Sequence, residues 1–371
     1  MKSADNTNEN KDIKKGNTNS MSDTNINISG KYNDTHKHKT LHILLILILV
    51  LVLILGTLFG IINFRQGRMM DLSVPYNINL DHNLINNASD PESVLTTTGF
   101  ASDLCVSPEA LPRDGVAMTS TDEKVLLFNL DTSTPLFAQG IYDRTYPASI
   151  TKIMTAIVAL KYGNMNDEVT ISKEAVTLEK DAQLSGMVPG DKTTMDALFH
   201  ALMVYSANDA AMAIAEHIGG TVENFVNMMN EEARTLGMTG THFVNPHGLH
   251  DDNHYTTAYD IYLMFNAAYH YQEFYDTMQT NAYNLNVTKP DGSTSAIRLD
   301  STDKYLTGEK TMPQNVSVLG GKTGTTSQAG SCLAILSQNS YGQPFISIIL
   351  NAENKNILYG DMDLLLNQIN Q

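Results

Sequence analysis

The sequence predicts an α/β domain at residues 113–371, with a mostly antiparallel sheet around a helical middle. Strand-like runs at 116–119 and 124–130 flank a Ser-Thr-Asp-Glu turn and are expected to form an opening hairpin. Further strand-like runs occur near the end of the chain, at 316–322, 332–337 and 345–350. Because strands at both ends enclose the helical middle, we expect one sheet closed by the N- and C-terminal segments.

The helical middle begins at residues 150–162, which are apolar nearly all round, as expected of a helix buried inside a domain. Other helical patterns occur at 195–205, 209–218, 222–236 and 257–269. The second and third of these four run directly into a glycine, a common helix end. A final apolar stripe at 354–370 predicts a helix that packs back across the sheet.

Three segments precede this domain. Residues 1–40 are nearly empty of large apolar side chains and are predicted to be a disordered tail. An uncharged apolar run at 43–62 predicts a transmembrane helix, assigned to 41–62, and 63–112 reads as a polar linker. A cleaved signal peptide is the alternative, but its apolar region is usually about 7–15 residues and ends in a small-x-small site. Neither condition is met here.

The charges that flank the span give a slight orientation signal. Lys31, Lys37 and Lys39 precede it and Arg65 and Arg68 follow it, a small excess of positive charge on the N-terminal side. We therefore expect a single-pass cell-membrane protein with a cytoplasmic N-terminus and an extracytoplasmic domain.

Composition excludes some classes of function. The chain has 24 Lys and Arg against 40 Asp and Glu, a formal net charge of -16, which argues against a nucleic-acid partner. Its two cysteines, Cys105 and Cys332, lie far apart without metal-binding spacing and are either free thiols or one disulfide. No metal or other cofactor is predicted.

Ser149-Ile-Thr-Lys152 carries the first candidate chemistry. A spacing of three on a helix places both side chains on one face, so the amine can reach the hydroxyl. Apolar neighbours would desolvate the amine and lower its pKa, making Lys152 a base for a nucleophilic Ser149. The alternative is that Ser149 only caps the helix while Lys152 reaches solvent. The pattern is weak alone, since Ser301-Thr-Asp-Lys304 also fits it.

Ser206-Ala-Asn208 lies between two predicted helices and supplies the second set of candidates. Helix capping is the simpler interpretation of both residues. The functional interpretation is that a tight turn places them beside Ser149. Ser206 would then relay a proton to the departing amine, and Asn208 would hold the substrate backbone.

Lys322-Thr-Gly324-Thr325 ends a strand-like run and supplies the third set. Gly324 leaves room for a ligand along the strand edge. Lys322 with the hydroxyls of Thr323 and Thr325 would bind a terminal carboxylate, although a solvated strand-end lysine is the simpler interpretation. The backbone N–H groups of Ser149 and Thr325 could form an oxyanion hole.

With these three motifs in this order, the chain resembles the serine D-alanyl-D-alanine carboxypeptidases, the low-molecular-mass penicillin-binding proteins. The resemblance spans about residues 113–352. It includes Tyr-Pro-Ala-Ser-Ile-Thr-Lys-Ile-Met-Thr-Ala (146–156), Ser-Ala-Asn-Asp-Ala-Ala-Met-Ala-Ile-Ala-Glu-His-Ile-Gly-Gly (206–220), Asn-Pro-His-Gly-Leu (245–249) and Gly-Lys-Thr-Gly-Thr-Thr-Ser-Gln-Ala-Gly-Ser (321–331).

The resemblance implies a penicilloyl-serine-transferase, β-lactamase-like fold with its cleft between sheet and helical lobe. It implies that Ser149 is acylated, Lys152 accepts the proton, Ser206 is the third catalytic residue and Lys322 contacts the substrate carboxylate. The implied substrate is the peptidoglycan stem pentapeptide, which loses its terminal D-alanine. The implied inhibitors are β-lactams.

The chain departs from the family pattern in three places. Ser-Ala-Asn208 replaces the more usual Ser-Gly-Asn, and Ser301-Thr-Asp303 stands where an Asn-x-Asn stretch is common. Many members also carry a second β-rich domain and a C-terminal anchor. In this chain we expect the N-terminal span to replace that anchor.

Three rival functions were weighed. A class A β-lactamase needs a glutamate to activate water, and no Glu-x-x-Leu-Asn lies between Asn208 and Lys322. A catalytically inert wall-binding homologue is disfavoured because all three motifs are intact. A metallopeptidase would use a dense acidic and histidine cluster, but the chain has no helical His-Glu-x-x-His. The residues of that cluster are His247, His250, Asp251, Asp252 and His254.

Overall fold

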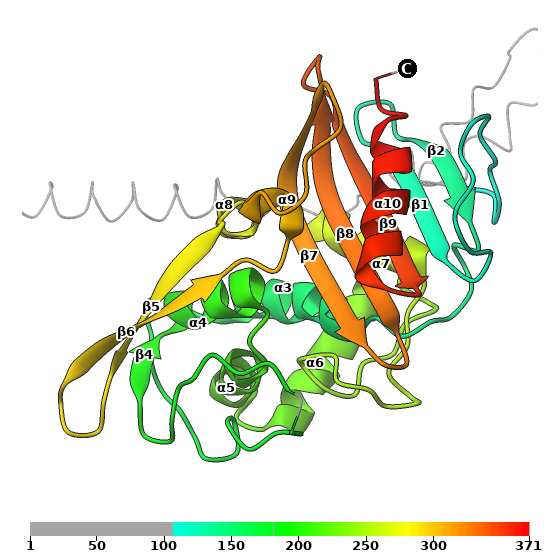
Figure 1. Cartoon of the computed structure of the whole chain (residues 1–371). Helices are drawn as coiled ribbons and strands as arrows, with labels where there is room; N and C mark the ends of the chain where they lie inside the picture. The colour runs from blue at the N-terminus through cyan, green and yellow to red at the C-terminus, as the bar shows by residue number, and fades with distance from the viewer. Residues whose placement is uncertain (1–106, 181, 371) are drawn as a thin grey trace, which may run out of the picture. The chain divides into compact units, whose positions relative to one another are not determined.

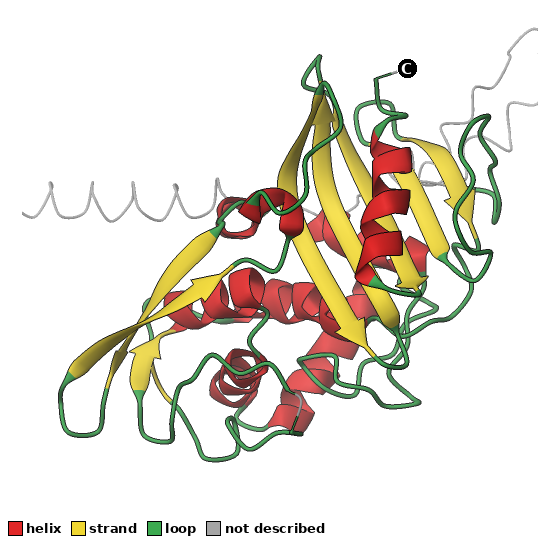
Figure 2. Cartoon of the chain, in the orientation of Figure 1, coloured by secondary structure: helices red, strands yellow, loops and turns green. Residues whose placement is uncertain are grey.

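A computed structural model describes residues 107–180 and 182–370, which contain two antiparallel sheets and a set of helices (Figure 2). The strands are β1 (Lys124–Asn129), β2 (Thr134–Gln139), β3 (Glu168–Thr170), β4 (Lys192–Thr194), β5 (Ala282–Thr288), β6 (Thr294–Asp300), β7 (Val316–Thr326), β8 (Gly330–Asn339) and β9 (Pro344–Ala352). The helices are η1, a 3₁₀ helix (Ala148–Thr151), α3 (Lys152–Tyr162), α4 (Met195–His200), η2, a π-helix (Ala201–Tyr205), α5 (Asn208–Gly219), α6 (Val222–Thr235), α7 (Ala258–Ala268), α8 (Gln272–Met278), α9 (Lys304–Thr307) and α10 (Lys355–Leu366).

The larger sheet has five strands in the order β2-β1-β9-β8-β7 and is covered on both faces (Figure 1). Successive side chains of a strand point to opposite faces, and in β1 Leu126 and Phe128 join the core beneath the helical lobe. Val125 and Leu127 join a second core with α10. Because β1 pairs with β9, the N-terminal strand is held by the C-terminal ones. The predicted mixed α/β fold with an antiparallel sheet is confirmed.

Helix α3 is buried along most of its length. Its residues from Lys152 to Ala159 are all buried, which confirms the helix predicted from an apolar pattern on every face. Because a helix sealed on all sides can hold only one position, it fixes Lys152 inside the core.

The predicted opening hairpin is wrong in one of its two strands. β1 pairs with β2 rather than with 116–119, and Asn129 Oδ1 accepts bonds from the turn amides of Asp131 and Thr132. The backbone N–H of Thr119 instead bonds Asp361 Oδ2 of α10, at 2.9 Å. The apolar residues of 116–119, Val116 and Met118, pack against the core beneath α10. Their alternation therefore resembles that of a strand although the segment forms none.

The second sheet was not predicted. It has four strands in the order β3-β4-β5-β6, and the β5–β6 hairpin extends away from the larger sheet (Figure 1). The hairpin closes through a bond from Lys289 N to Ser293 O. The intervening Pro290-Asp-Gly292 is a turn signal that could have revealed it.

The other predicted elements are confirmed with shifted ends. The pattern at 195–205 forms α4 and then the π-helix η2, while 209–218, 222–236 and 257–269 correspond to α5, α6 and α7. The last helix, α10, ends at Leu366 rather than at 370. Strands β7, β8 and β9 correspond to the three predicted near the C-terminus.

The N-terminal predictions fall largely outside the described residues. The predicted tail, the predicted span at 41–62 and residues 63–106 of the predicted linker all lie there. Among the residues that are described, no helix is long and apolar enough to cross a membrane.

Candidate active site

Ser149 lies half-buried on the short helix η1, directly before α3. The preceding Ala148 has φ of 47°, an unusual backbone conformation for a residue with a side chain. The loop that contains Gly248 packs against this turn. A Cβ atom placed on Gly248 would lie only 1.9 Å from the carbonyl oxygen of Ala148. The glycine in Asn-Pro-His-Gly-Leu therefore allows this loop to press against the turn that carries Ser149.

Lys152 is the centre of the first polar cluster. Its Nζ lies 2.8 Å from Ser149 Oγ, 2.7 Å from Asn208 Oδ1 and 2.7 Å from the carbonyl oxygen of His247. The side chain of Lys152 is 0 % exposed. The spacing of three therefore brings the amine to the hydroxyl as the sequence predicts, and Asn208 joins them from the start of α5.

The amine of Lys152 is electrostatically unfavourable as a cation. Burial lowers its pKa well below the usual value of 10.5, and the nearby charge of Lys322 lowers it further, against a smaller opposing effect of Asp209. None of the three atoms bonded to Nζ belongs to a carboxylate. These surroundings favour the neutral amine, the form of Lys152 that can act as a base.

Lys322 is the centre of a second cluster. Its Nζ donates to Ser206 Oγ at 2.8 Å and to the carbonyl oxygen of Thr323 at 2.9 Å. Ser206 ends the π-helix with φ of 65°, so the tight turn predicted there is confirmed. This left-handed turn lets one short segment supply both Ser206 and Asn208.

Two opposing effects act on the charge of Lys322. Burial lowers its pKa to about 7, and the carboxylate of Asp303 acts in the opposite direction. Asp303 itself is buried, which raises its pKa to about 6 despite hydrogen bonds and the charge of Lys322.

Strand β7 lies directly against Ser149. A Cβ atom placed on Gly324 would lie 3.0 Å from both the amide nitrogen of Ser149 and the carbonyl oxygen of Pro147. Thr325 is exposed at the next position, and Thr323 Oγ1 lies 2.5 Å from Thr302 Oγ1. The absence of a side chain at Gly324 therefore permits the close approach of β7 to η1, a packing role that the sequence argument did not include.

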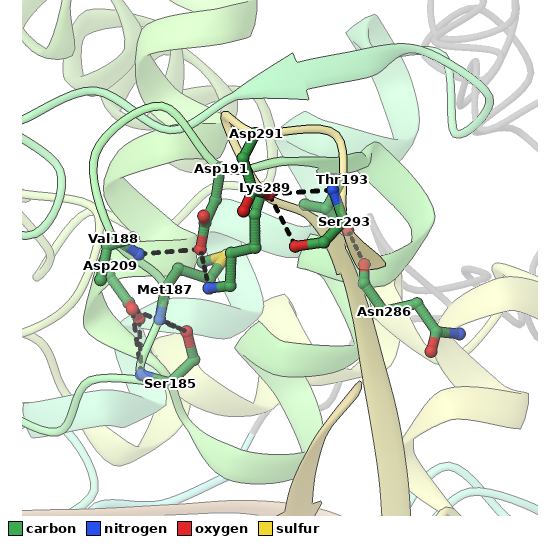
Figure 3. A network of polar contacts seen from close by, with 10 residues as sticks. All are labelled: Ser185, Met187, Val188, Asp191, Thr193, Asp209, Asn286, Lys289, Asp291 and Ser293. Carbon is green, nitrogen blue, oxygen red and sulfur yellow. Dashed lines mark hydrogen bonds and ion pairs between the residues drawn. The ribbon is translucent and has the colours of Figure 1, made fainter. Parts of the chain in front are cut away.

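The loop at 183–191 was not predicted as part of the site. Asp209, beside Asn208, accepts bonds from the backbone N–H and hydroxyl of Ser185 (Figure 3). Farther along, Asp191 accepts from Val188 N and from Lys289 Nζ of the β5–β6 hairpin. These contacts fix the loop against the Ser206–Asn208 turn and explain what the missed second sheet contributes.

Other positions also escaped the sequence argument. The carbonyl oxygen of His247 contacts Lys152, but a backbone atom leaves no residue-type signal. Thr302 contacts Thr323, and the only available signal was its place in the unusual Ser301-Thr-Asp303 stretch.

The histidine cluster supports the backbone next to Ser149. His254 Nδ1 accepts a bond from Val244 N, and its Nε2 contacts Thr151 Oγ1, which donates to the Ala148 carbonyl. Burial lowers the pKa of His247 and of His254 to about 3, so both are neutral. Within 107–180 and 182–370, no three His, Cys, Asp or Glu side chains are grouped to hold a metal.

The second Ser-x-x-Lys pattern has no comparable geometry. Ser301 Oγ accepts a bond from Asp303 N, whereas Lys304 Nζ lies over the ring of Tyr359, 5.7 Å from its centroid. Cys332 is a buried free thiol whose pKa burial raises to about 12, and Cys105 lies outside the described residues.

This fold is shared with a DD-transpeptidase whose structure has been solved. The crystal structure of the Streptomyces K15 DD-transpeptidase superposes with a TM-score of 0.62 and 26 % identity, covering 69 % of this chain and 98 % of that one. The similarity therefore includes nearly the whole of the Streptomyces protein.

The sequence gives the family. The Peptidase_S11 model, described as D-alanyl-D-alanine carboxypeptidase, matches residues 115–354, more than half of the chain. The chain belongs to this family, and the resemblance found in its motifs is confirmed.

Curated relatives are also named D-alanyl-D-alanine carboxypeptidases. The D-alanyl-D-alanine carboxypeptidase DacF of Bacillus subtilis is 30 % identical over 218 residues, which cover 57 % of this chain and 52 % of that protein. DacC of Escherichia coli is 31 % identical over 262 residues, which cover 68 % and 62 %. The chain thus spans between half and two thirds of the length of these relatives.

Proposed function

We propose that this chain is a membrane-anchored serine D-alanyl-D-alanine carboxypeptidase. Its reaction removes the terminal D-alanine of peptidoglycan stem pentapeptides through an acyl-serine intermediate, and β-lactams acylate the same serine. Family membership and the names of the relatives support this activity. The observation that carries it is the 2.8 Å contact between a fully buried Lys152 Nζ and Ser149 Oγ.

The three partners of Lys152 favour a direction for the proton. A neutral amine has two N–H donors and one lone pair, and two of the partners, Asn208 Oδ1 and the His247 carbonyl, are oxygens that can only accept. Both N–H groups therefore point to these oxygens. The lone pair is left for the third partner, Ser149, whose hydroxyl proton it can take.

Acylation follows from this geometry. Ser149 Oγ attacks the carbonyl carbon of the penultimate D-alanine while its proton passes to Lys152 Nζ. The backbone N–H groups of Ser149 and Thr325, on segments that pack together at Gly324, stabilise the developing oxyanion. Collapse of the tetrahedral intermediate breaks the C–N bond and leaves an ester on Ser149.

The departing amine needs a proton, and Ser206 is placed to give it. Ser206 Oγ accepts a bond from Lys322, so its own hydrogen is free to pass to the amine while Lys322 reprotonates it. The proton that Lys152 took from Ser149 then replaces the one that Lys322 lost. Lys152 is again neutral and can activate the water that hydrolyses the ester.

The terminal carboxylate of the substrate binds beside these groups. Lys322 supplies positive charge, and Thr323 and Thr325 supply hydroxyls on the same strand. In this arrangement Asn208 also serves the base, because its Oδ1 is bonded to Lys152. Its Nδ2 is the atom that would contact the substrate backbone.

The predicted span at 41–62 would tether the catalytic domain to the outer face of the cell membrane, where peptidoglycan lies. The same span would leave residues 1–40 in the cytoplasm.

The test uses the full chain in detergent. Incubation with diacetyl-L-lysyl-D-alanyl-D-alanine should release D-alanine, and fluorescent penicillin should label the protein stably on Ser149. Both signals should vanish in Ser149→Ala and persist in the control Ser293→Ala, an exposed serine of the β5–β6 hairpin. Rapid release of the label would instead indicate a β-lactamase, and intact D-alanine release by Ser149→Ala would contradict the mechanism.

A further inference from the structure

The segment 301–303 forms a wall beside the carboxylate pocket. It follows β6 and precedes α9, and Thr302 N bonds the carbonyl oxygen of Val204. Thr302 Oγ1 lies 2.5 Å from Thr323 Oγ1. Residue 303 is therefore held next to the part of β7 that carries Lys322.

Only one of the two carboxylate oxygens of Asp303 forms hydrogen bonds with the described residues. Its Oδ1 caps α9 by accepting from Tyr305 N at 2.9 Å, with a longer contact of 3.4 Å from the hydroxyl of Tyr359. Its Oδ2 is buried without a hydrogen-bond partner among the described residues. An asparagine would cap α9 equally well, so capping does not require the negative charge.

The groups that face Asp303 show what the charge acts on. Tyr305 and Tyr359 contact it from α9 and α10, and Lys322 faces it from β7. Of these, only Lys322 is a cation, and it is also fully buried. The charge of Lys322 also acts on a second buried lysine, Lys152. Burial opposes the charge of Lys322, and Asp303 is the neighbour that favours it.

We propose that Asp303 is a positioning residue of the carboxylate pocket, whose buried charge keeps Lys322 cationic and so preserves the preference for substrates with a free terminal carboxylate as the pH rises. The inference rests on the proposed function, because it concerns the same substrate. Asp303 does not touch the substrate in this account. It acts through Lys322.

Removal of the charge has a defined consequence. Burial lowers the pKa of Lys322, and the charge of Asp303 opposes this effect. Without that charge the pKa of Lys322 falls further, and its ammonium loses a proton at lower pH. The preference for a carboxylate should then disappear at lower pH than in the native protein. Substrates without a terminal carboxylate do not use this charge for binding, so its effects on the shared chemical steps cancel in a comparison of the two kinds of substrate.

The experiment compares two substrates on each enzyme. The kcat/KM values of diacetyl-L-lysyl-D-alanyl-D-alanine and of its methyl ester are measured between about pH 5.5 and 9, and their ratio reports the carboxylate preference. In Asp303→Asn the midpoint at which the ratio falls should move down by about one pH unit. Because both substrates are read on one protein, a loss of folded enzyme cancels.

Asp363→Asn is the matched control. Asp363 accepts the hydroxyl of Tyr305 and pairs with Lys310 in the same cluster of α9 and α10, but it faces neither Asp303 nor Lys322 in the interactions described for them. In Asp363→Asn the ratio of the kcat/KM values for the acid and its methyl ester should depend on pH as it does in the native chain. A profile of Asp303→Asn that coincides with both would overturn the proposal.

A binding measurement separates this inference from the proposed function. In the Ser149→Ala background, calorimetry of the acid and ester peptides over the same pH range reads the pocket without turnover. The downward shift caused by Asp303→Asn should appear there too. If the native enzyme is inactive but Asp303→Asn shifts the binding profile, the proposed activity alone is contradicted. If the native enzyme is active but the substitution causes no shift, the role of Asp303 alone is contradicted.

Discussion

Lys152 and Lys322 are equally buried but have different surroundings. Both side chains are essentially inaccessible, at 0 % and 1 % exposed. Both bond a hydroxyl and a carbonyl oxygen, but the charge of Lys322 acts on Lys152 more strongly than that of Asp209, whereas Lys322 has the carboxylate of Asp303 as its charged neighbour. The pKa of Lys152 falls well below its usual value, and that of Lys322 falls to about 7.

The difference shows that burial alone does not assign a role to a lysine. Burial removes the water that stabilises an ammonium, and the neighbours then decide how much of the charge survives. In the proposed function the neutral amine beside Ser149 is the base, and the charged amine beside Ser206 binds the substrate carboxylate. The two lysines also interact, since the charge of Lys322 helps to keep Lys152 neutral.

The largest effect should come from Lys152→Ala. Acylation of Ser149 by penicillin should slow by about 10³-fold, about 4 kcal/mol, because the proton of Ser149 loses its acceptor. Stopped-flow labelling with a fluorescent penicillin measures this rate. Lys161→Ala, on the exposed end of the same helix, should acylate at the native rate. Equal rates in the two variants would show that the amine of Lys152 is not the base.

A smaller and more selective effect should come from Lys322→Ala. The kcat/KM preference for the acid over its methyl ester should fall by roughly 30-fold, about 2 kcal/mol, because the substrate carboxylate loses its cation. The acid limb of the pH–rate profile should also move to higher pH, since removal of a nearby positive charge raises the pKa of Lys152. Steady-state kinetics with both substrates checks this, and an unchanged preference would remove Lys322 from the carboxylate pocket.

Glu123, at the α10 side of the sheet, shows how burial and charged neighbours act together on an acid. Its side chain is 0 % exposed and its two carboxylate oxygens have no donor among the described residues. Burial first, and then a hydrogen bond and the negative charge of Asp361, raise its pKa from 4.5 to about 8. A proton on Glu123 removes its buried negative charge and lets it donate toward Asp361 instead of repelling it.

Glu123→Gln should therefore change how stability depends on pH. The folded-state pKa lies above the unfolded value, so the native protein keeps a proton that the unfolded chain releases between about pH 4.5 and 8. The free energy of unfolding should fall over this range by on the order of 2 kcal/mol in the native chain and should stay flatter in Glu123→Gln. Urea titrations at several pH values measure both slopes, and parallel slopes would argue against the proton on Glu123.

The sequence predicted which candidate site residues lie together better than it predicted the scaffold that holds them. Ser149, Lys152, Ser206, Asn208 and Lys322 could be proposed together because each belongs to a short motif of reactive side chains. The motif order also indicated the family and the antiparallel sheet.

Other features could not be predicted because they depend on contacts distant in sequence. The run at 116–119 has a strand-like pattern, but its place is decided by Asp361 at the far end of the chain. The carbonyl of His247 acts through its backbone, and the role of Asp303 requires knowing that Lys322 is buried beside it. The second sheet was missed although Pro290-Asp-Gly292 marks its hairpin turn.

The central claim is that Lys152 is neutral when it takes the proton of Ser149. The most direct measurement is the pH dependence of acylation by a β-lactam whose carboxylate is esterified, so that the charge of Lys322 has no ligand to act on. Because burial holds the pKa of Lys152 well below 10.5, the acylation rate should level off below pH 10 and should decline only at lower pH. A rate that rises about tenfold per pH unit up to pH 10 would contradict the account, since it would mean that the amine is an ordinary charged lysine.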